Sequence, residues 1–187
     1  MRIMQTLRDR NIEASDLPLY GWEDWATWEG KWELIEGIPY AMSPMPSKKH
    51  QRINGKVYRL FSEALESCPD CEAFLPVNFK IGKHNVLHPD LLILCGEDDD
   101  ELYVTQTPQL VLEILSPSTL KKDLHTKPKI YKSVRVPFYV IIDPQRESVS
   151  IFQLKKEAYV LLSEGREIYM ELALEPCKIK IDFGKIW

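Results

Sequence analysis

The stretch "LVLEILSPST", residues 110–119, carries a glutamate inside an otherwise apolar segment. Apolar residues on both sides of Glu113 predict a short β-strand that is buried on both faces. A lone carboxylate in such a strand is costly unless it is paired with a cation, protonated or bound to a metal. Glu113 therefore requires a partner from another part of the chain.

The composition is that of one globular domain with a substantial core. The chain has 187 residues, of which 44% are hydrophobic and 28% charged, and its net charge is −4. A negative net charge argues against strong sequence-independent binding to nucleic-acid phosphates, although it is compatible with a local basic patch. The run "STLKKDLHTKPKIYKSVR" is such a patch, and we expect it to be a solvated helix face.

Two further features bear on location. No apolar run is long enough to span a bilayer, and the polar N-terminus lacks the apolar core of a signal peptide, so we expect a soluble cytoplasmic protein with no membrane partner. The pair Cys68 and Cys71 in "CPDC" has no second pair at zinc-finger spacing and follows a helix instead of a strand. We therefore predict a solvent-facing turn with free thiols, as in a reducing compartment.

Periodicity and turn signals give an order of elements. They predict a short tryptophan-rich helix near residues 22–28, a hairpin turning at Glu36–Gly37, and a long helix capped by Ser47. Strands are predicted at 72–82, 87–96 and 108–116, followed by a helix at 119–135 that contains Pro128. A buried strand at 136–144 and four short strands between 148 and 183 complete the chain. The acidic loop "EDDDE" at 97–101 is expected to be solvated, without the spaced ligands of a calcium site.

This order predicts a mixed sheet with helices on its faces, in the α/β (α+β) class. The helix between the third and fourth strands indicates a parallel crossover, whereas the short links between the first three strands favour antiparallel pairing. We expect residues 1–187 to form a single domain. Within it we expect an N-terminal lead-in and short helix at 1–29, a core at 30–145 and a β-rich extension at 146–187.

Asp90 and Glu113 lie on neighbouring strands of that order, and both interrupt apolar runs. If the strands pair, the two carboxylates repel unless a cation lies between them or they share a proton. Carboxylate oxygens suit a magnesium or manganese ion, and the main-chain carbonyl of Ile114 could be a third ligand. Lys127, on the following helix, could orient a water and offset negative charge.

These residues resemble the PD-(D/E)xK nuclease superfamily and, more closely, the Uma-two family of restriction-endonuclease-like proteins. The likeness rests on five segments that occur in order over residues 30–145: "WELIEG", "MSPMPSKKHQ", "HPDLLIL", "LVLEILSPST" and "VPFYVIIDP". It implies a restriction-endonuclease-like core with a divalent metal held by Asp90 and Glu113, and it implies Lys127 as the catalytic lysine. It also suggests Glu33 or Glu36 as an additional acid, and His50 as a contact to phosphate or water.

The sequence departs from the superfamily pattern at two positions. Leu115 stands where the usual lysine follows two residues after the glutamate, so Lys127 must act from the helix instead. Pro128 would kink a helix that began earlier, so either the helix begins near Lys127 or its first half is bent. Lys129 is therefore a second candidate for the catalytic lysine.

Three functions remain open from the sequence. The first is a metal-dependent endonuclease that cleaves phosphodiester bonds, with DNA as the expected partner. The second is a catalytically inactive module that binds nucleic acid or protein on the same scaffold, which the acidic net charge and the displaced lysine favour. The third is an assembly role, in which edge strands of the β-rich tail pair across a two-fold axis to form a homodimer.

Overall fold

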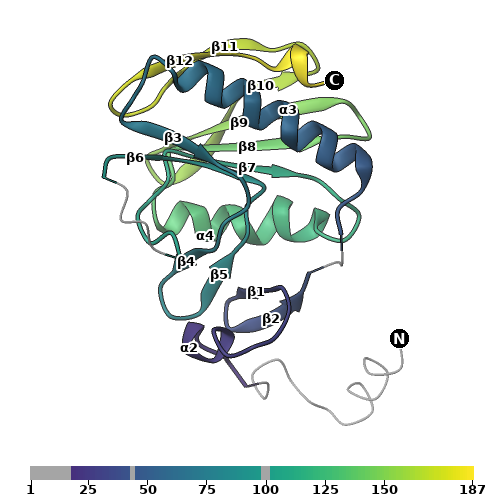
Figure 1. Ribbon diagram of the computed structural model, residues 1–187, viewed down its shortest axis with the longest axis vertical. Coiled ribbons are helices and arrows are strands. Elements are labelled where there is room, and N and C mark those ends of the chain that lie inside the picture. Colours follow the sequence, from purple (N-terminus) through teal and green to yellow (C-terminus); the bar gives the residue numbers. More distant parts are fainter. Residues whose placement is uncertain (1–17, 43–44, 98–101) are drawn as a thin grey trace.

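A computed structural model of the chain describes residues 18–42, 45–97 and 102–187. Its centre is a six-stranded sheet in the order β10-β9-β8-β7-β6-β3 (Figure 1). The strands are β3 (Cys71–Phe74), β6 (Leu91–Cys95), β7 (Leu110–Ile114), β8 (Phe138–Asp143), β9 (Ser148–Lys155) and β10 (Ala158–Gly165). Only β7 and β8 pair in parallel within this sheet, which confirms the predicted crossover.

Two smaller sheets flank the central one. A four-stranded sheet has the order β2-β1-β5-β4, with β1 (Trp32–Ile35), β2 (Ile38–Ala41), β4 (Phe79–Ile81) and β5 (Asn85–Leu87). The short helix α2 (Trp22–Trp25) precedes it. A two-stranded sheet is formed by β11 (Tyr169–Ala173) and β12 (Lys178–Asp182), and a 3₁₀ turn, η3 (Phe183–Ile186), ends the chain.

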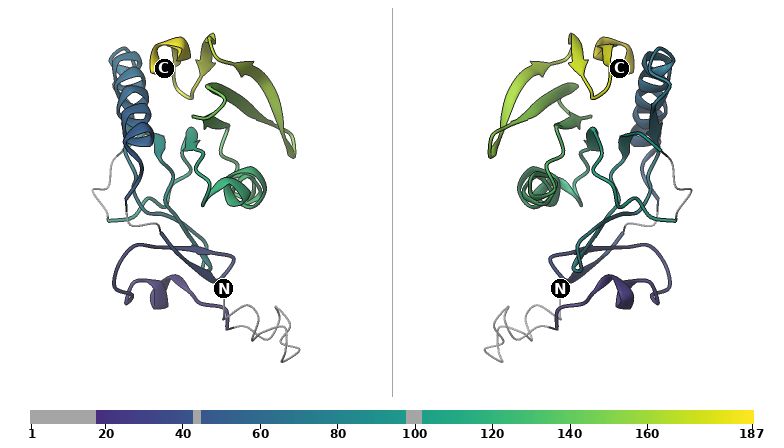
Figure 2. Two further views of the ribbon diagram at one scale, coloured as in Figure 1. Left: turned by 90° about the vertical axis from the view of Figure 1, so that its right-hand side faces the viewer. Right: turned by 90° about the vertical axis from the view of Figure 1, so that its left-hand side faces the viewer.

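Helices cover both faces of the central sheet (Figure 2). The long helix α3 (Lys48–Leu65) and the β11–β12 hairpin bury one face, on which Leu110, Leu112 and Ile114 point inward. The helix α4 (Lys127–Ser133) packs on the other face, where Val111 belongs to the same apolar cluster as Tyr131. The alternation of β7 side chains between the two clusters places Glu113 on the α4 face, because side chains alternate along a strand.

Two predicted strands are each divided in the structure. The segment 72–82 forms β3 and β4, and the segment 87–96 forms β5 and β6; in each case the two strands join different sheets. Pro76 and Pro89 lie at the breaks. Proline has no amide hydrogen for the strand ladder, so the chain leaves one sheet and enters the next at these points. The four strands predicted after residue 148 are all present.

The prediction about the cysteines was wrong. Cys68 and Cys71 are buried, and only the two residues between them are exposed. The structure joins Cys68 to Cys177 and Cys71 to Cys95 in disulfides, so none of the four thiols is free. Spacing along the chain could not show this, because each partner comes from a distant strand or loop.

Two expectations concern residues that lie outside the described ranges, namely the lead-in over residues 1–17 and the tip of the acidic loop at 98–101. Within the described part of the chain, no helix combines the length and the apolar character that crossing a membrane requires.

Candidate active site

The start of β6 and the end of β7 bring Asp90 and Glu113 together. The two strands are antiparallel with Leu91 opposite Leu112, so the preceding Asp90 lies beside Glu113. Directly opposed residues of an antiparallel pair share one face of the sheet. Asp90 is fixed further by its Oδ2, which accepts a hydrogen bond of 2.8 Å from the main-chain N–H of Ile114. Asp90 and Glu113 therefore lie side by side on neighbouring strands.

A buried lysine lies at the centre of the acidic residues. The Nζ atom of Lys127 is 2.9 Å from Oε1 of Glu33, 2.9 Å from Oε1 of Glu113 and 3.2 Å from Oδ1 of Asp123. All four residues are at most 3% exposed. The hydroxyl of Tyr131 donates a further hydrogen bond of 2.7 Å to Oε1 of Glu113. The buried charge of Glu113 thus has the partners that the sequence required.

The helix following β7 places Lys127 by an unusual local geometry. Residues Lys122–Thr126 form a π-helical turn, η2, and α4 begins at Lys127 with Pro128 in its first turn. Proline is tolerated in the first turn of a helix because the N–H that it lacks would have no partner there. Asp123, Lys127 and Tyr131 follow at four-residue intervals, so they lie on one side of the element and face Glu113. A helix that begins near Lys127 is one of the two alternatives predicted from the sequence.

Glu33 joins the cluster from the β1–β2 hairpin. Its Oε2 lies 2.7 Å from Nζ of Lys122, and its Oε1 accepts a hydrogen bond from the main-chain N–H of His88 at 3.3 Å. Burial alone would raise the pKa of this carboxyl, but Lys127 and Lys122 outweigh burial and lower the pKa to about 2. Glu33 is therefore ionised at every ordinary pH.

The other two sequence candidates lie apart from this cluster. Glu36 is exposed in the hairpin turn with φ of 52°, and its main-chain N–H bonds to the side chain of Asn85. Lys129 is exposed on α4. Of the two acids suggested by the resemblance, the structure brings Glu33 to Lys127, and of the two lysines it brings Lys127 to the carboxylates.

His50 reaches the site from the first turn of α3. Ser47 caps this helix as predicted, because its hydroxyl oxygen accepts a hydrogen bond from the main-chain N–H of His50. The Nε2 atom of His50 lies 3.3 Å from Oδ2 of Asp90. Burial opposes the charged imidazolium, but Asp90 and the main chain of Ile114 outweigh it and raise the pKa of His50. Asp90 and Ile114 thus favour the charged form of this imidazole.

The electrostatics of the cluster leave an excess of negative charge. Burial raises the pKa of Glu113 well above its usual value, and Asp123, Asp90 and Glu33 add to this effect while Lys127 opposes it. Burial also opposes the charge on Lys127, but its three carboxylate neighbours outweigh burial and hold its pKa well above the usual range. When ionised, Glu33, Asp90, Glu113 and Asp123 carry four negative charges, against two positive charges from Lys122 and Lys127.

Several members of the site were not predicted from the sequence. Asp123, Lys122 and Tyr131 contact Glu33, Glu113 or Lys127, whereas the basic run was expected to be a solvated face. Lys121, Lys129 and Arg135 of that run are indeed exposed, but Lys127 is buried and Lys122 half-buried. The four-residue spacing of Asp123, Lys127 and Tyr131 was the available signal, and Pro128 between them concealed it.

Comparison with known proteins shows the family of the chain. A family model described as "Putative restriction endonuclease" (Uma2) matches residues 22–181, which is most of the chain. The chain belongs to the Uma2 family. The central mixed sheet with helices on both faces is the restriction-endonuclease-like fold, as the sequence resemblance implied.

A solved structure supports the fold of this Uma2 protein independently. It is described as a "putative nuclease belonging to DUF820" from Anabaena variabilis. The two chains are 15% identical, the TM-score is 0.72, and the match covers 89% of this chain and 96% of the other. At this identity the likeness concerns the fold alone. No curated protein matches the chain by sequence.

Proposed function

We propose that this Uma2 protein is a divalent-metal-dependent endonuclease that hydrolyses phosphodiester bonds, with DNA as its substrate. The observation that carries the proposal is the buried carboxylate cluster around Lys127, in which Glu113 and Asp90 lie on adjacent strands. Membership of a family described as "Putative restriction endonuclease" supports a nuclease. The DNA substrate and the divalent metal are our own inference.

The donor set fits a magnesium or manganese ion. With four carboxylates against two ammonium groups, a bound dication would leave the buried charges balanced when His50 is neutral. Asp90, Glu113 and the main-chain carbonyl of Ile114 would hold the ion, since all three offer the hard oxygen ligands that these metals prefer. When bound, such an ion lowers the pKa of a coordinated water and stabilises negative charge on phosphate oxygens.

Lys127 would bind and orient the attacking water. An ammonium group has three N–H donors, and in this structure three carboxylates surround it. Glu33 and Asp123 would keep the ammonium in place when Glu113 turns to a metal, and the donor now directed at Glu113 would become free for water or a phosphate oxygen. The raised pKa of Lys127 makes it a hydrogen-bond donor and excludes it as the proton acceptor at neutral pH.

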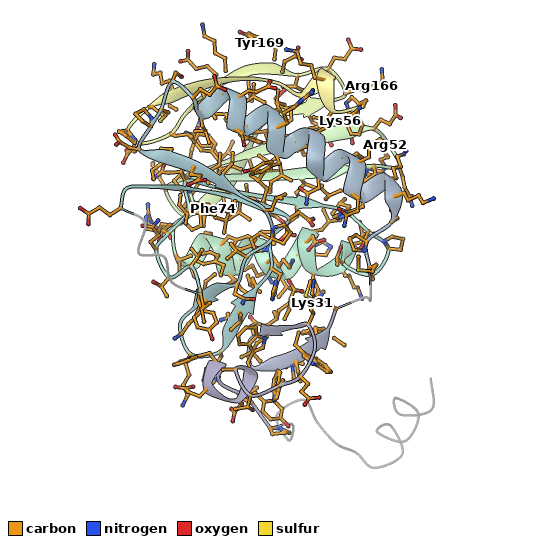
Figure 3. All side chains as sticks on the ribbon, in the orientation of Figure 1. Lys31, Arg52, Lys56, Phe74, Arg166 and Tyr169 are labelled. Atoms are coloured by element: carbon orange, nitrogen blue, oxygen red, sulfur yellow. A yellow bond between two sulfur atoms is a disulfide. The ribbon has the colours of Figure 1, made fainter. Side chains whose placement is uncertain are left out.

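The first turns of α3 would contact the phosphate backbone. Lys48, Lys49 and Arg52 are exposed there beside His50, and Figure 3 shows Arg52 and Lys56 along the same helix. The side chain of Lys49 also bonds to the main-chain oxygen of Pro144. These cations offset the acidic net charge near the site and give the local positive surface that binding of a polyanion requires.

The alternative is a non-catalytic binding module on the same scaffold. The specific observation in its favour is the burial of Lys127 among three carboxylates, which leaves the residue 1% exposed and its ammonium group without access to water unless a neighbour moves. Leu115, in place of the usual superfamily lysine, packs in the apolar cluster on the α4 face and offers no substitute.

A pair of measurements distinguishes the two functions. Wild-type protein is incubated with single-stranded and double-stranded DNA in Mg²⁺ or Mn²⁺, and manganese binding is measured by calorimetric titration. Asp90→Asn is expected to abolish both cleavage and metal binding while the fold survives, and Glu63→Gln, on the exposed side of α3, is the matched control. Cleavage that persists in Asp90→Asn would remove the proposed site, and binding of DNA without turnover in any metal would establish the binding module.

We also propose a homodimer in which β10 pairs with its symmetry mate. β10 is a terminal strand of the six-stranded sheet, so one of its edges has no strand partner there. It exposes Val160, Leu161 and Leu162, at 41%, 47% and 37%. Exposed apolar edges of this kind favour pairing with a second chain.

A further inference from the structure

The four cysteines of the chain converge at one end of the molecule, away from the acidic site. Cys68 follows the end of α3, Cys71 begins β3, Cys95 ends β6, and Cys177 lies between β11 and β12. Helix, central sheet and C-terminal hairpin each contribute to the group. The short turn between Cys68 and Cys71 is closed by a hydrogen bond of 2.9 Å from the N–H of Cys71 to the oxygen of Cys68.

Three of the four sulfur atoms lie close enough together to reach one ion. Those of Cys68, Cys71 and Cys177 are all within 4.8 Å of one another, and the sulfur of Cys95 is bonded to that of Cys71. Among the described residues, these three cysteines are the group of His, Cys, Asp or Glu side chains that meets such a spacing. In tetrahedral zinc thiolate sites, Zn–S bonds of about 2.3 Å place the sulfurs about 3.8 Å apart.

The backbone holds the cysteines close together in two pairs. Cys71 and Cys95 face each other across the β3–β6 ladder with their Cα atoms 4.0 Å apart, and the Cα atoms of Cys68 and Cys177 are 6.0 Å apart. The N–H of Gly96 bonds to the oxygen of Asp70 at 2.8 Å, which ties the "CPDC" turn to the strand that carries Cys95. Reduction of the two disulfides would free the four side chains to turn toward one ion.

We propose that the reduced protein binds one Zn²⁺ ion through Cys68, Cys71, Cys95 and Cys177. Each of the two disulfides takes up two electrons and two protons from a dithiol reductant, which is itself oxidised to a disulfide. The four resulting thiols lose their protons to solvent as the zinc ion binds. Soft thiolate ligands in a tetrahedral set select zinc over the magnesium or manganese of the acidic site.

The site gives the C-terminal hairpin a crosslink under reducing conditions as well as oxidising ones. β11 and β12 form an isolated two-stranded sheet, and such a sheet is only marginally stable alone. It packs on α3, and Cys177 in its loop connects it to the end of that helix. Structural zinc contributes directly to folding stability because the unfolded chain has no preformed site.

The test uses the full chain, reduced with a dithiol and freed of the reductant under anaerobic conditions. Zinc is titrated in competition with a chromophoric chelator. The metal content is measured by elemental mass spectrometry, and reactive thiols are counted with a thiol reagent. We expect one zinc ion per chain, protection of four thiols, and a thermal unfolding temperature that zinc raises in the reduced protein but not in the oxidised protein. Cobalt in place of zinc is expected to give the visible absorption of a tetrahedral thiolate site.

Variants separate this site from the acidic one. Cys177→Ser and Cys95→Ser are expected to weaken zinc binding by at least about 100-fold, since loss of even an outer-shell partner costs about 10–100-fold. The matched control is the double variant Asp90→Asn with Glu113→Gln, which should keep its zinc. Three results would overturn the proposal: no zinc binding by the reduced wild type, iron as the bound metal, or equal zinc binding by the cysteine variants. The wild-type result does not depend on the folding of any variant.

Discussion

The Nζ atom of Lys127 lies 2.9 Å from Oε1 of Glu113, and both groups are buried between β7 and α4. The interaction makes each charge tolerable in the interior, because the attraction between them and the hydrogen bonds around them offset the loss of hydration. It also fixes the lysine beside the carboxylate that we propose as a metal ligand. We therefore expect the same contact to stabilise the free protein and to position Lys127 in the proposed reaction.

Replacement of Lys127 by methionine should abolish cleavage and also destabilise the fold. Removal of one partner of a buried ion pair leaves an uncompensated charge and costs about 3–5 kcal/mol; here three carboxylates lose their common cation. The free energy of unfolding in urea measures the effect. Lys129→Met is the control, because Lys129 lies on the same helix but is exposed. Equal stability of the two variants would show that Lys127 is not the buried cation of the cluster.

Replacement of Glu113 by glutamine should separate function from stability. Burial raises the pKa of this carboxyl, so the interior already disfavours its charged form and a neutral amide of the same shape is tolerated. We expect the loss of manganese binding and of DNA cleavage, with a smaller change in the free energy of unfolding than Lys127→Met causes. Thermal unfolding and calorimetric titration on the same preparation provide both readouts. Metal binding that survives in Glu113→Gln would exclude this residue as a ligand.

The acid dependence of stability should reveal the ionised state of Glu33. Its pKa is about 2 in the folded protein against an ordinary value of 4.5, so its charged form favours folding. This contribution is fully present above about pH 4.5 and is lost as the pH falls toward 2. Because a tenfold change in proton affinity corresponds to about 1.4 kcal/mol, the contribution amounts to about 3 kcal/mol.

Comparison with Glu33→Gln measures that contribution together with a lowering of the pKa of Glu113 and of Asp123, because the charge of Glu33 raises both. The difference in unfolding free energy between wild type and variant should shrink as the pH falls from about 4.5 toward 2. Glu36→Gln, in the exposed turn of the same hairpin, should show no such dependence. A wild-type advantage that does not change between pH 5 and pH 2.5 would contradict the placement of Glu33 between Lys122 and Lys127.

Individual residues show how much of the site could be predicted from the sequence. Asp90, Glu113 and Lys127 were found together because charged residues in buried strands need partners, and the order of strands placed these three at one end of the sheet. The turn signal at Glu36–Gly37 could also have distinguished the two candidate acids. Glu36 lies in the turn itself and is exposed, whereas Glu33 lies on β1 and is buried.

Other features depended on contacts that no local pattern encodes. The cysteine pairings follow from the β3–β6 register and from the packing of the C-terminal hairpin on α3, and neither is visible in the spacing of "CPDC". Asp123 was not predicted as a member of the site because Pro128 suggested a broken helix. The π-helical turn before Pro128 keeps Asp123 and Lys127 on one side of the helical element. Tertiary packing, and not propensity, decided both cases.

The edge of β10 offers a prediction about assembly. Leu161 is 47% exposed on a terminal strand of the central sheet, between two other exposed apolar residues. A charge introduced there should oppose pairing of two such edges, since charged side chains on an edge strand are a usual protection against pairing. We expect the wild type to sediment as a dimer at micromolar concentration and Leu161→Glu as a monomer. Tyr169→Glu is the control, because Tyr169 is 68% exposed and belongs to β11, a strand of the separate two-stranded sheet (Figure 3). A monomeric wild type, or a dimer unaffected by Leu161→Glu, would count against pairing through β10.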